Sequence, residues 1–146
     1  AGGGRGGGGG GLGGGFVGAG DAFAPRTIRV HPLTALELSP PRGAPYLNAH
    51  IELLDAADDP VKALGELTFI LYSGERVGQS LRQIASWPVE AFADPALNAR
   101  AFDHVTRTYR FRLEGLPEDL DPTEGLVLEA GFRSGGRERI SARHTF

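Results

Sequence analysis

The chain has 146 residues, which suits one domain of ordinary size, and it contains no cysteine, which excludes disulfides, zinc–thiolate sites and cysteine nucleophiles. Its net charge of −3 argues against a general nucleic-acid-binding protein, because such proteins normally carry a basic excess. No stretch has the apolar length of a membrane span. The sequence therefore predicts no nucleic-acid partner, no membrane span and a single domain.

The N-terminal segment differs sharply in composition from the rest of the chain. Fourteen of the 23 glycines lie in the first 20 positions. Glycine has the largest backbone entropy to lose on ordering, so this arm gains little from folding by itself. Four apolar side chains larger than alanine interrupt the glycines, at Leu12, Phe16, Val17 and Phe23. We therefore divide the chain into a glycine-rich arm, residues 1–24, and a domain, residues 25–146.

The first half of the domain alternates apolar and polar residues in the period-two pattern of strands. A strand is predicted at 26–30, Pro32 interrupts it, and the pattern resumes at 34–38. In the next strand, Leu47, Ile51 and Leu53 are expected inside, and His50 and Glu52 outside. Residues 55–60 form a turn, and another strand follows at 67–72, with apolar residues on both faces.

The second half continues the pattern with one helix. A weaker strand is predicted at 81–87, with Gln83 on the same face as Ala85 and Trp87. Asp94 followed by Pro95 is typical of a helix N-cap with proline in the first turn, and the helix should end near Ala101. Strands follow at 109–113 and 126–133, and the 134–137 turn predicts a hairpin with a last strand through 140–142.

About seven short strands joined by polar turns predict an all-β fold, an antiparallel β-sandwich of immunoglobulin, transthyretin or C2 type behind the arm. An open barrel is the alternative, because sequence does not give strand order. Six large side chains are expected to form most of the core: Phe69, Trp87, Tyr109, Phe111, Leu128 and Phe132.

Catalytic and cofactor motifs do not stand out. The spacing of Gly13, Gly15 and Gly18 matches a dinucleotide-binding fingerprint, but no strand precedes it and no helix follows, so polyglycine explains the match. No phosphate-binding loop, nucleophile elbow or zinc-binding His-Glu-x-x-His is present. We therefore expect a protein that is not an enzyme and that holds no organic cofactor.

Acidic residues suggest one possible metal site. If consecutive strands alternate in direction, carboxylates from two loops meet at one end of the sandwich, as in calcium-binding sandwich domains. The ordinary alternative is that these residues cap helices and begin turns. The calcium hypothesis names five residues: Asp55, Asp58, Asp59, Asp94 and Asp103.

Six arginines lie in the last three predicted strands and their connecting turn. The interleaved Glu114, Glu129 and Glu138 favour a solvent-facing surface of salt bridges over a site for an acidic polymer. The arginines are Arg110, Arg112, Arg133, Arg137, Arg139 and Arg143.

A ten-residue stretch before and within one strand resembles a pattern in uncharacterised exported bacterial β-sandwich proteins, some of them lipoprotein-like. The pattern is Asp-x-x-Thr-x-Thr-Tyr at the start of a strand, here Phe102-Asp103-His104-Val105-Thr106-Arg107-Thr108-Tyr109-Arg110-Phe111. The resemblance covers mainly residues 66–146. It implies export and a β-sandwich, and it brings no catalytic residues.

These observations predict an exported structural subunit, extracellular or at the cell surface, that assembles with copies of itself through its arm. The start at Ala1 suits cleavage of an export signal after small residues. The arm adds as a strand to a neighbour's sheet edge, or its glycines bundle as extended helices. The alternative is a tethered binding module with the arm as a spacer. The assembly residues are Gly6, Gly7, Gly8, Gly9, Gly10, Gly11, Leu12, Phe16, Val17 and Phe23.

Overall fold

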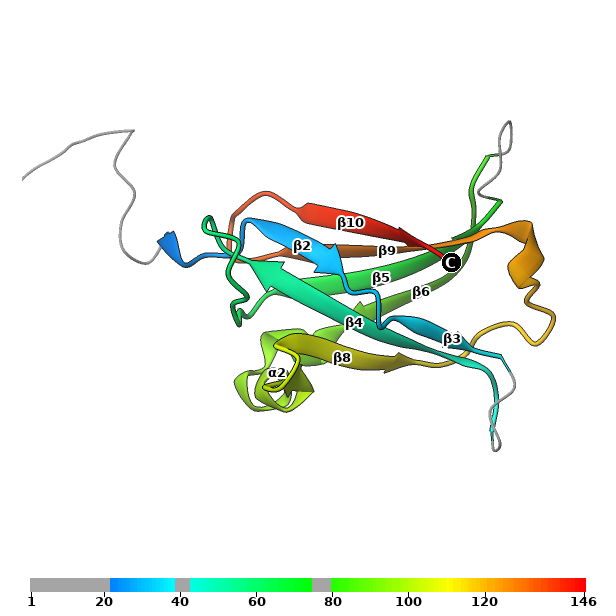
Figure 1. Cartoon of the computed structure of the whole chain (residues 1–146), viewed down its shortest axis with the longest axis horizontal. Coiled ribbons are helices and arrows are strands. Elements are labelled where there is room, and N and C mark those ends of the chain that lie inside the picture. The colour runs from blue at the N-terminus through cyan, green and yellow to red at the C-terminus, as the bar shows by residue number, and fades with distance from the viewer. Residues whose placement is uncertain (1–21, 39–42, 75–79) are drawn as a thin grey trace, which may run out of the picture.

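A computed structural model describes residues 22–38, 43–74 and 80–146 of the chain. These residues form two antiparallel sheets and little helix (Figure 1). The first sheet has the order β10–β9–β5–β6, and the second has the order β2–β4–β8–β7, with β3 also paired to β4. The prediction of a mostly β fold with antiparallel sheets is confirmed.

The elements follow the predicted order closely. The strands of the first sheet are β5 Glu66–Ser73, β6 Arg82–Val89, β9 Leu126–Arg133 and β10 Ile140–Thr145. Those of the second sheet are β2 Thr27–Val30, β3 Ala35–Glu37, β4 Tyr46–Leu54, β7 Phe102–Asp103 and β8 Thr108–Leu113. The helices are η2 Glu90–Ala93, α2 Pro95–Ala101 and η3 Pro122–Glu124.

Local sequence signals explain several of these boundaries. The Asp94 side chain accepts hydrogen bonds from the N–H groups of Ala96 and Leu97, as predicted for the N-cap of α2. Asp121 caps η3 in the same way. The predicted hairpin is present, with Ile140 to Thr145 of β10 paired to Phe132 to Val127 of β9.

The break between β2 and β3 is bridged by a side chain. Pro32 interrupts the edge strand as expected. The Thr34 hydroxyl accepts a hydrogen bond from the His50 N–H at 3.0 Å and donates one to the His50 carbonyl at 3.2 Å. The His31 N–H donates to the same carbonyl at 2.8 Å. The backbone of β4 is therefore satisfied where the strand beside it is missing.

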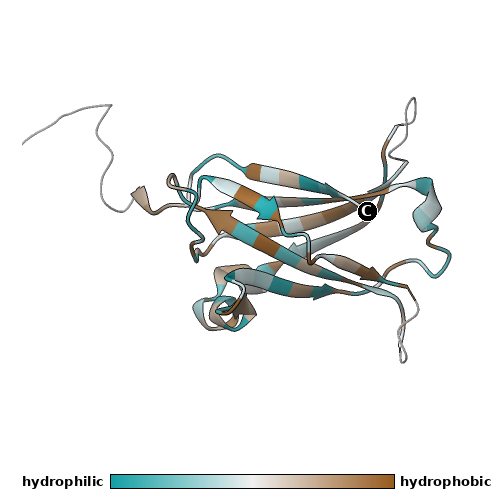
Figure 2. Ribbon diagram, viewed as in Figure 1, coloured by the Kyte–Doolittle hydropathy of each residue, from teal (hydrophilic) through white to brown (hydrophobic). Residues whose placement is uncertain are grey.

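The core lies between the two sheets, and hydrophobic residues alternate with hydrophilic ones along the strands that enclose it (Figure 2). One lateral side is closed by β2, which packs alongside β10. Phe69, Tyr109, Leu128 and Phe132 are buried in the core, as expected.

Several predicted positions require correction. Trp87 and Phe111 are only half-buried, because both lie at the open side between β6 and β8. Phe92, which the strand pattern did not include, is fully buried instead.

His50 and Glu52 were expected to face solvent but are buried, with exposed fractions of 6% and 8%. Long side chains from the neighbouring strands stand beside them: Arg29 is paired with Glu52, and Arg110 lies opposite His50 in the register. The pairing of β5 with β6 is irregular: Leu71 pairs with Ala85, but the next residue, Tyr72, pairs with Gln83. Ile84 is therefore an extra residue in β6. It packs against the core, and Gln83 is exposed.

Candidate functional site

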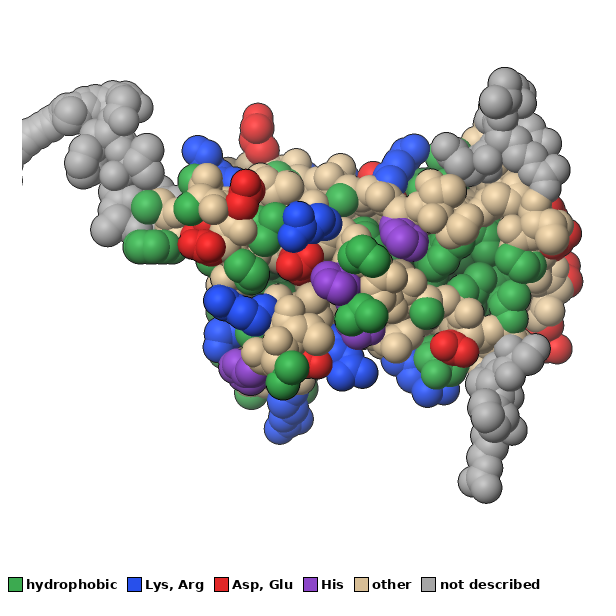
Figure 3. Space-filling model, in the orientation of Figure 1, with side chains coloured by type: hydrophobic (Ala, Val, Ile, Leu, Met, Phe, Trp, Pro, Cys, Tyr) green, Lys and Arg blue, Asp and Glu red, His purple; other side chains and the backbone are tan. Residues whose placement is uncertain are grey.

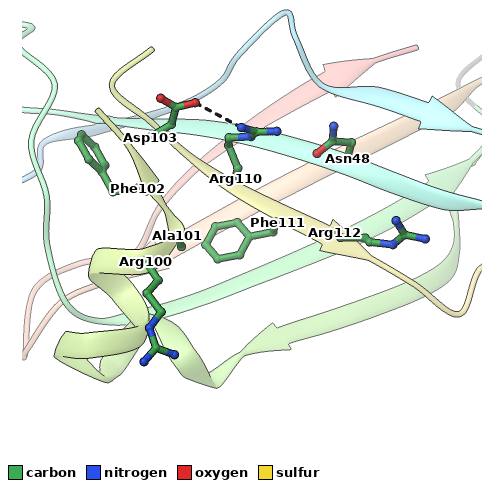
Figure 4. A pocket seen from close by; sticks show the side chains of 8 residues that line it. All are labelled: Asn48, Arg100, Ala101, Phe102, Asp103, Arg110, Phe111 and Arg112. Atoms are coloured by element: carbon green, nitrogen blue, oxygen red, sulfur yellow. Dashed lines mark hydrogen bonds and ion pairs between the residues drawn. The ribbon is translucent and has the colours of Figure 1, made fainter. Parts of the chain in front are cut away.

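A basic hollow lies along β8, where that strand passes the end of α2 (Figure 4). Its volume is about 410 Å³. Residues of α2, β4, β7 and β8 line it: Asn48, Arg100, Ala101, Phe102, Asp103, Arg110, Phe111 and Arg112. We call it the β8 hollow. It brings together three arginines from two elements in a chain whose net charge is negative.

The local fold explains why this part of β8 is accessible. β7 is only two residues long and pairs with Tyr109 and Thr108 alone. The chain just before β7 is the helix α2, which cannot continue the strand ladder. Within the described residues, no strand pairs with Arg110 to Leu113 on the side away from β4. The hollow therefore contains a free strand edge.

The three guanidinium groups stand around the hollow rather than meeting at one point. Arg110 points to Asp103, at 3.3 Å, whereas Arg100 extends from the end of α2 away from the other two (Figure 4). Arg112 is bound to Glu114 at 2.7 Å, and its guanidinium carbon lies 3.7 Å from the centre of the Tyr46 ring. Arg100 makes no salt bridge with any residue that the structure describes. This spread suits an extended anionic ligand better than a single compact anion.

The existing ion pairs leave binding capacity at the arginines. Arg110 and Arg112 keep 53% and 54% of their side chains exposed, and exposed ion pairs contribute little stability. Each guanidinium has five N–H donors, of which one carboxylate uses at most two. The N–H groups of Val105 and Thr106, and then Arg110, hold the pKa of Asp103 below its ordinary value. Asp103 thus stays ionised and orients Arg110 at neutral pH.

Phe111 adds an apolar element to the hollow. Its ring lies between Ala101 and Arg112 in Figure 4 and is half-buried. It contacts the rings of Phe69 and Phe92 at centroid distances of 5.7 and 5.9 Å. A ligand that lies along β8 in the hollow therefore contacts both arginine side chains and the apolar ring of Phe111.

A buried polar network fixes α2 against β8. The Tyr109 hydroxyl donates to Oδ1 of Asn98 at 2.7 Å and accepts from the N–H of Ala63 at 3.1 Å. The Asn98 amide donates to the carbonyls of Ala63 and Phe92 at 2.8 and 2.9 Å. Burial raises the pKa of Tyr109, so its hydroxyl remains protonated and can donate. The network sets the position of the helix that carries Arg100.

Two histidines lie close together on the outer face of the same sheet. Histidine side chains are visible near the middle of the surface in Figure 3. The rings of His31 and His50 are 6.5 Å apart. His50 is buried, and its Nδ1 has no hydrogen-bond partner among the residues that the structure describes. Burial, then Arg110 and His31, lower the pKa of His50, against a smaller opposing effect of Asp103. Burial also lowers the pKa of His144 in the other sheet.

These two shifts predict that stability falls on acidification below about pH 6.5, the ordinary histidine value. Because the folded-state pKa is the lower one, the unfolded chain binds more protons in this window, and the free energy of unfolding decreases as the pH falls. His50→Gln should reduce the loss of stability between pH 7 and 5 in urea melts, and adding His144→Gln should reduce it further. An unchanged loss in both variants would contradict this assignment.

The structure gives each of the five proposed calcium residues a place in ordinary turn or cap geometry. The Asp55 carboxylate is buried and accepts from the N–H groups of Ala57 and Asp59, within one turn that also contains Asp58. Asp94 caps α2 and Asp103 binds Arg110. Among the described residues, no group of three or more histidine or acidic side chains is arranged to hold a metal ion.

Of the assembly residues, only Phe23 lies within the described part of the chain, where its side chain is 68% exposed. Gly6 to Gly11, Leu12, Phe16 and Val17 lie outside it.

The arginine-rich surface is present as salt bridges. Arg133 binds Glu66 at 2.9 Å, and Arg139 and Arg143 approach Glu129 at 3.9 Å. Sequence reasoning placed Arg110 and Arg112 on this surface but missed that they share a hollow with Arg100, which depends on how α2 packs. The only local signal was the helix itself, with Arg100 in its last turn.

Comparison with known proteins gives no family: no protein-family model matches the chain, and no curated protein matches it. Within residues 22–38, 43–74 and 80–146, no helix has the length and apolar character needed to cross a membrane.

Proposed function

We propose that this domain is a binding module that takes an anionic, extended ligand along the β8 hollow. One observation carries the proposal: three arginines and the amide of Asn48 line a hollow that contains the half-buried Phe111 ring at a free strand edge, in a chain of net charge −3. A local positive field in an otherwise acidic protein selects ligands by charge and speeds their approach. The arginines supply directional donors to carboxylate or phosphate oxygens.

The ion pairs of the hollow support a docking role over a purely structural one. Arg110 and Arg112 are held by Asp103 and Glu114, yet about half of each side chain faces solvent. Such pairs fix the direction of a guanidinium without using all of its donors. The hollow is thus partly organised before a ligand arrives, which lowers the entropic cost of binding.

We also retain two proposals from the sequence: a sandwich of immunoglobulin, transthyretin or C2 type, and assembly of an exported protein through its arm. Assembly through the arm is supported by its composition alone, since all of its proposed contact residues except Phe23 lie outside the described residues. Ligand binding in the hollow and assembly through the arm are compatible, because they use different parts of the chain.

The proposed binding is tested on the full chain by NMR titration with a capped peptide of six glutamates. We expect amide shifts at Arg100 to Asp103 and at Arg110 to Arg112, and none with six glutamines. The double variant Arg110→Gln/Arg112→Gln should bind about tenfold more weakly or worse, because two charged contacts are lost.

The other sheet offers a matched control. Arg133 and Arg143 are also paired with glutamates, and each is 54% exposed, close to the 53% and 54% of the tested pair. Arg133→Gln/Arg143→Gln should leave the affinity unchanged. Equal losses in the two double variants would mean that only overall charge matters, and the proposed site would be wrong.

A further inference from the structure

The free edge of β8 defines what shape of ligand fits the hollow. On one side β8 pairs with β4 along Tyr109 to Leu113, and on the other side β7 covers only Thr108 and Tyr109. Beyond that point, the backbone groups of β8 that face away from β4 have no strand partner in the described part of the chain. An exposed strand edge is a template for another extended segment, which supplies the missing backbone hydrogen bonds.

Side chains alternate across this edge. Arg110 and Arg112 lie on the outer face of the sheet with Asn48, their neighbour on β4, whereas Phe111 lies on the inner face against Phe69. A strand added beside β8 places its own side chains alternately on the same two faces. Its outer residues would lie next to the two arginines, and its inner residue would lie next to the phenyl ring.

Both ends of this edge are held in place. At one end Tyr109 is bound to Asn98 of α2. At the other, the Trp87 indole N–H of β6 donates to the carbonyl of Glu114, just after β8, at 2.7 Å. Between these two contacts Phe111 remains half-buried. An edge fixed at both ends needs little reordering to accept a strand.

We propose that a partner protein docks here by adding a short extended segment to β8, with acidic residues beside Arg110 and Arg112 and an apolar residue beside Phe111. This inference rests on the proposed function and specifies its ligand as a peptide of alternating acidic and apolar residues. Charge complementarity selects the occupant, because three arginines line the hollow and only two carboxylates, Asp103 and Glu114, are paired with them. Residues 1–21 of this chain carry one arginine, Arg5, and one acid, Asp21, so the arm lacks the required pattern.

The test uses the full chain and a capped peptide that alternates glutamate and valine over six residues. In a paired strand, only every second N–H faces the neighbouring strand. Two further peptides therefore carry N-methyl groups, one on the odd amides and one on the even amides. One of the two should bind at least about tenfold more weakly than the unmethylated peptide, and the affinity of the other should be closer to that of the unmethylated peptide.

A peptide of the same composition with three glutamates followed by three valines controls for charge. It should bind more weakly than the alternating peptide. Phe111→Ser in the protein should weaken binding of the alternating peptide but not binding of the peptide of six glutamates. If both N-methylated peptides bind like the parent, strand addition is wrong, although anion binding stands.

Three other outcomes would also overturn the inference. If no acidic peptide binds, the proposed function fails with it. If a heparin hexasaccharide binds more tightly and depends on Arg110 and Arg112, the ligand is a sulfated carbohydrate. If a synthetic peptide of residues 10–24 displaces the bound alternating peptide at a lower concentration than the unlabelled alternating peptide itself does, the occupant is the arm of a second copy.

Discussion

Replacing Phe92 by alanine should lower the free energy of unfolding by about 3–5 kcal/mol, as expected for a fully buried phenylalanine. The Phe92 side chain has no exposed surface. Its ring centroid lies 4.5 Å from the ring centroid of Tyr109 and 5.5 Å from that of Phe132. It therefore joins β8 of one sheet to β9 of the other at the centre of the core. Urea denaturation followed by circular dichroism measures the loss.

The same substitution at Phe23 is a matched control, because that ring is 68% exposed. Phe23→Ala should change stability by less than about 0.5 kcal/mol. If Phe92→Ala does not fold, Phe92→Leu remains measurable, with an expected loss of about 1–2 kcal/mol from the smaller change in shape and volume. A loss below about 1 kcal/mol in Phe92→Ala would show that η2 is not packed as described.

Asn98→Ala should cost about 3 kcal/mol, because it leaves several buried polar groups without partners. The amide donates to the carbonyls of Ala63 and Phe92, and its oxygen accepts from the Tyr109 hydroxyl. A second consequence is expected at the β8 hollow: acidic peptide should bind more weakly, because the network positions α2 and hence Arg100. Denaturation and peptide titration measure the two effects separately.

A double-mutant cycle with Tyr109→Phe separates the network from general damage to the core. Tyr109→Phe removes only the hydroxyl and should cost about 1–2 kcal/mol. Because the two residues share a hydrogen bond, the double variant should lose less than the sum of the single variants, by about 1 kcal/mol. Strict additivity would show that Asn98 and Tyr109 do not act as one network.

Much of the fold could be predicted from local patterns. The period-two alternation located β4, β9 and β10, and the Asp94-Pro95 pair located the start of α2, because strands and helix caps leave short-range signals. Phe92 left no such signal. It lies in a short 3₁₀ turn after β6, where neither strand nor helix periodicity applies, and only the packing of the two sheets buries it.

The candidate site could not be predicted from local sequence patterns, because it depends on the topology of the sheets. The pattern put Phe111 in the core with Tyr109, which is correct for the inner face of the sheet. However, its half-exposure follows from β7 ending after two residues, so that β8 becomes an edge strand partway along its length. Similarly, Arg100 lines the same hollow as Arg110 and Arg112 only because α2 folds back beside β8. Strand order and edges depend on contacts between distant parts of the chain.

The position of Trp87 has a practical consequence. It is the only tryptophan in the chain, and its indole N–H is bound to the backbone carbonyl directly after β8. Its half-buried ring lies at the open side of the two sheets, next to the edge along which we propose that ligands add. Indole emission depends on local polarity and hydrogen bonding, so the protein carries its single indole fluorophore at the end of its candidate site. Occupancy of that site can therefore be followed by optical spectroscopy, without labels and at low protein concentration.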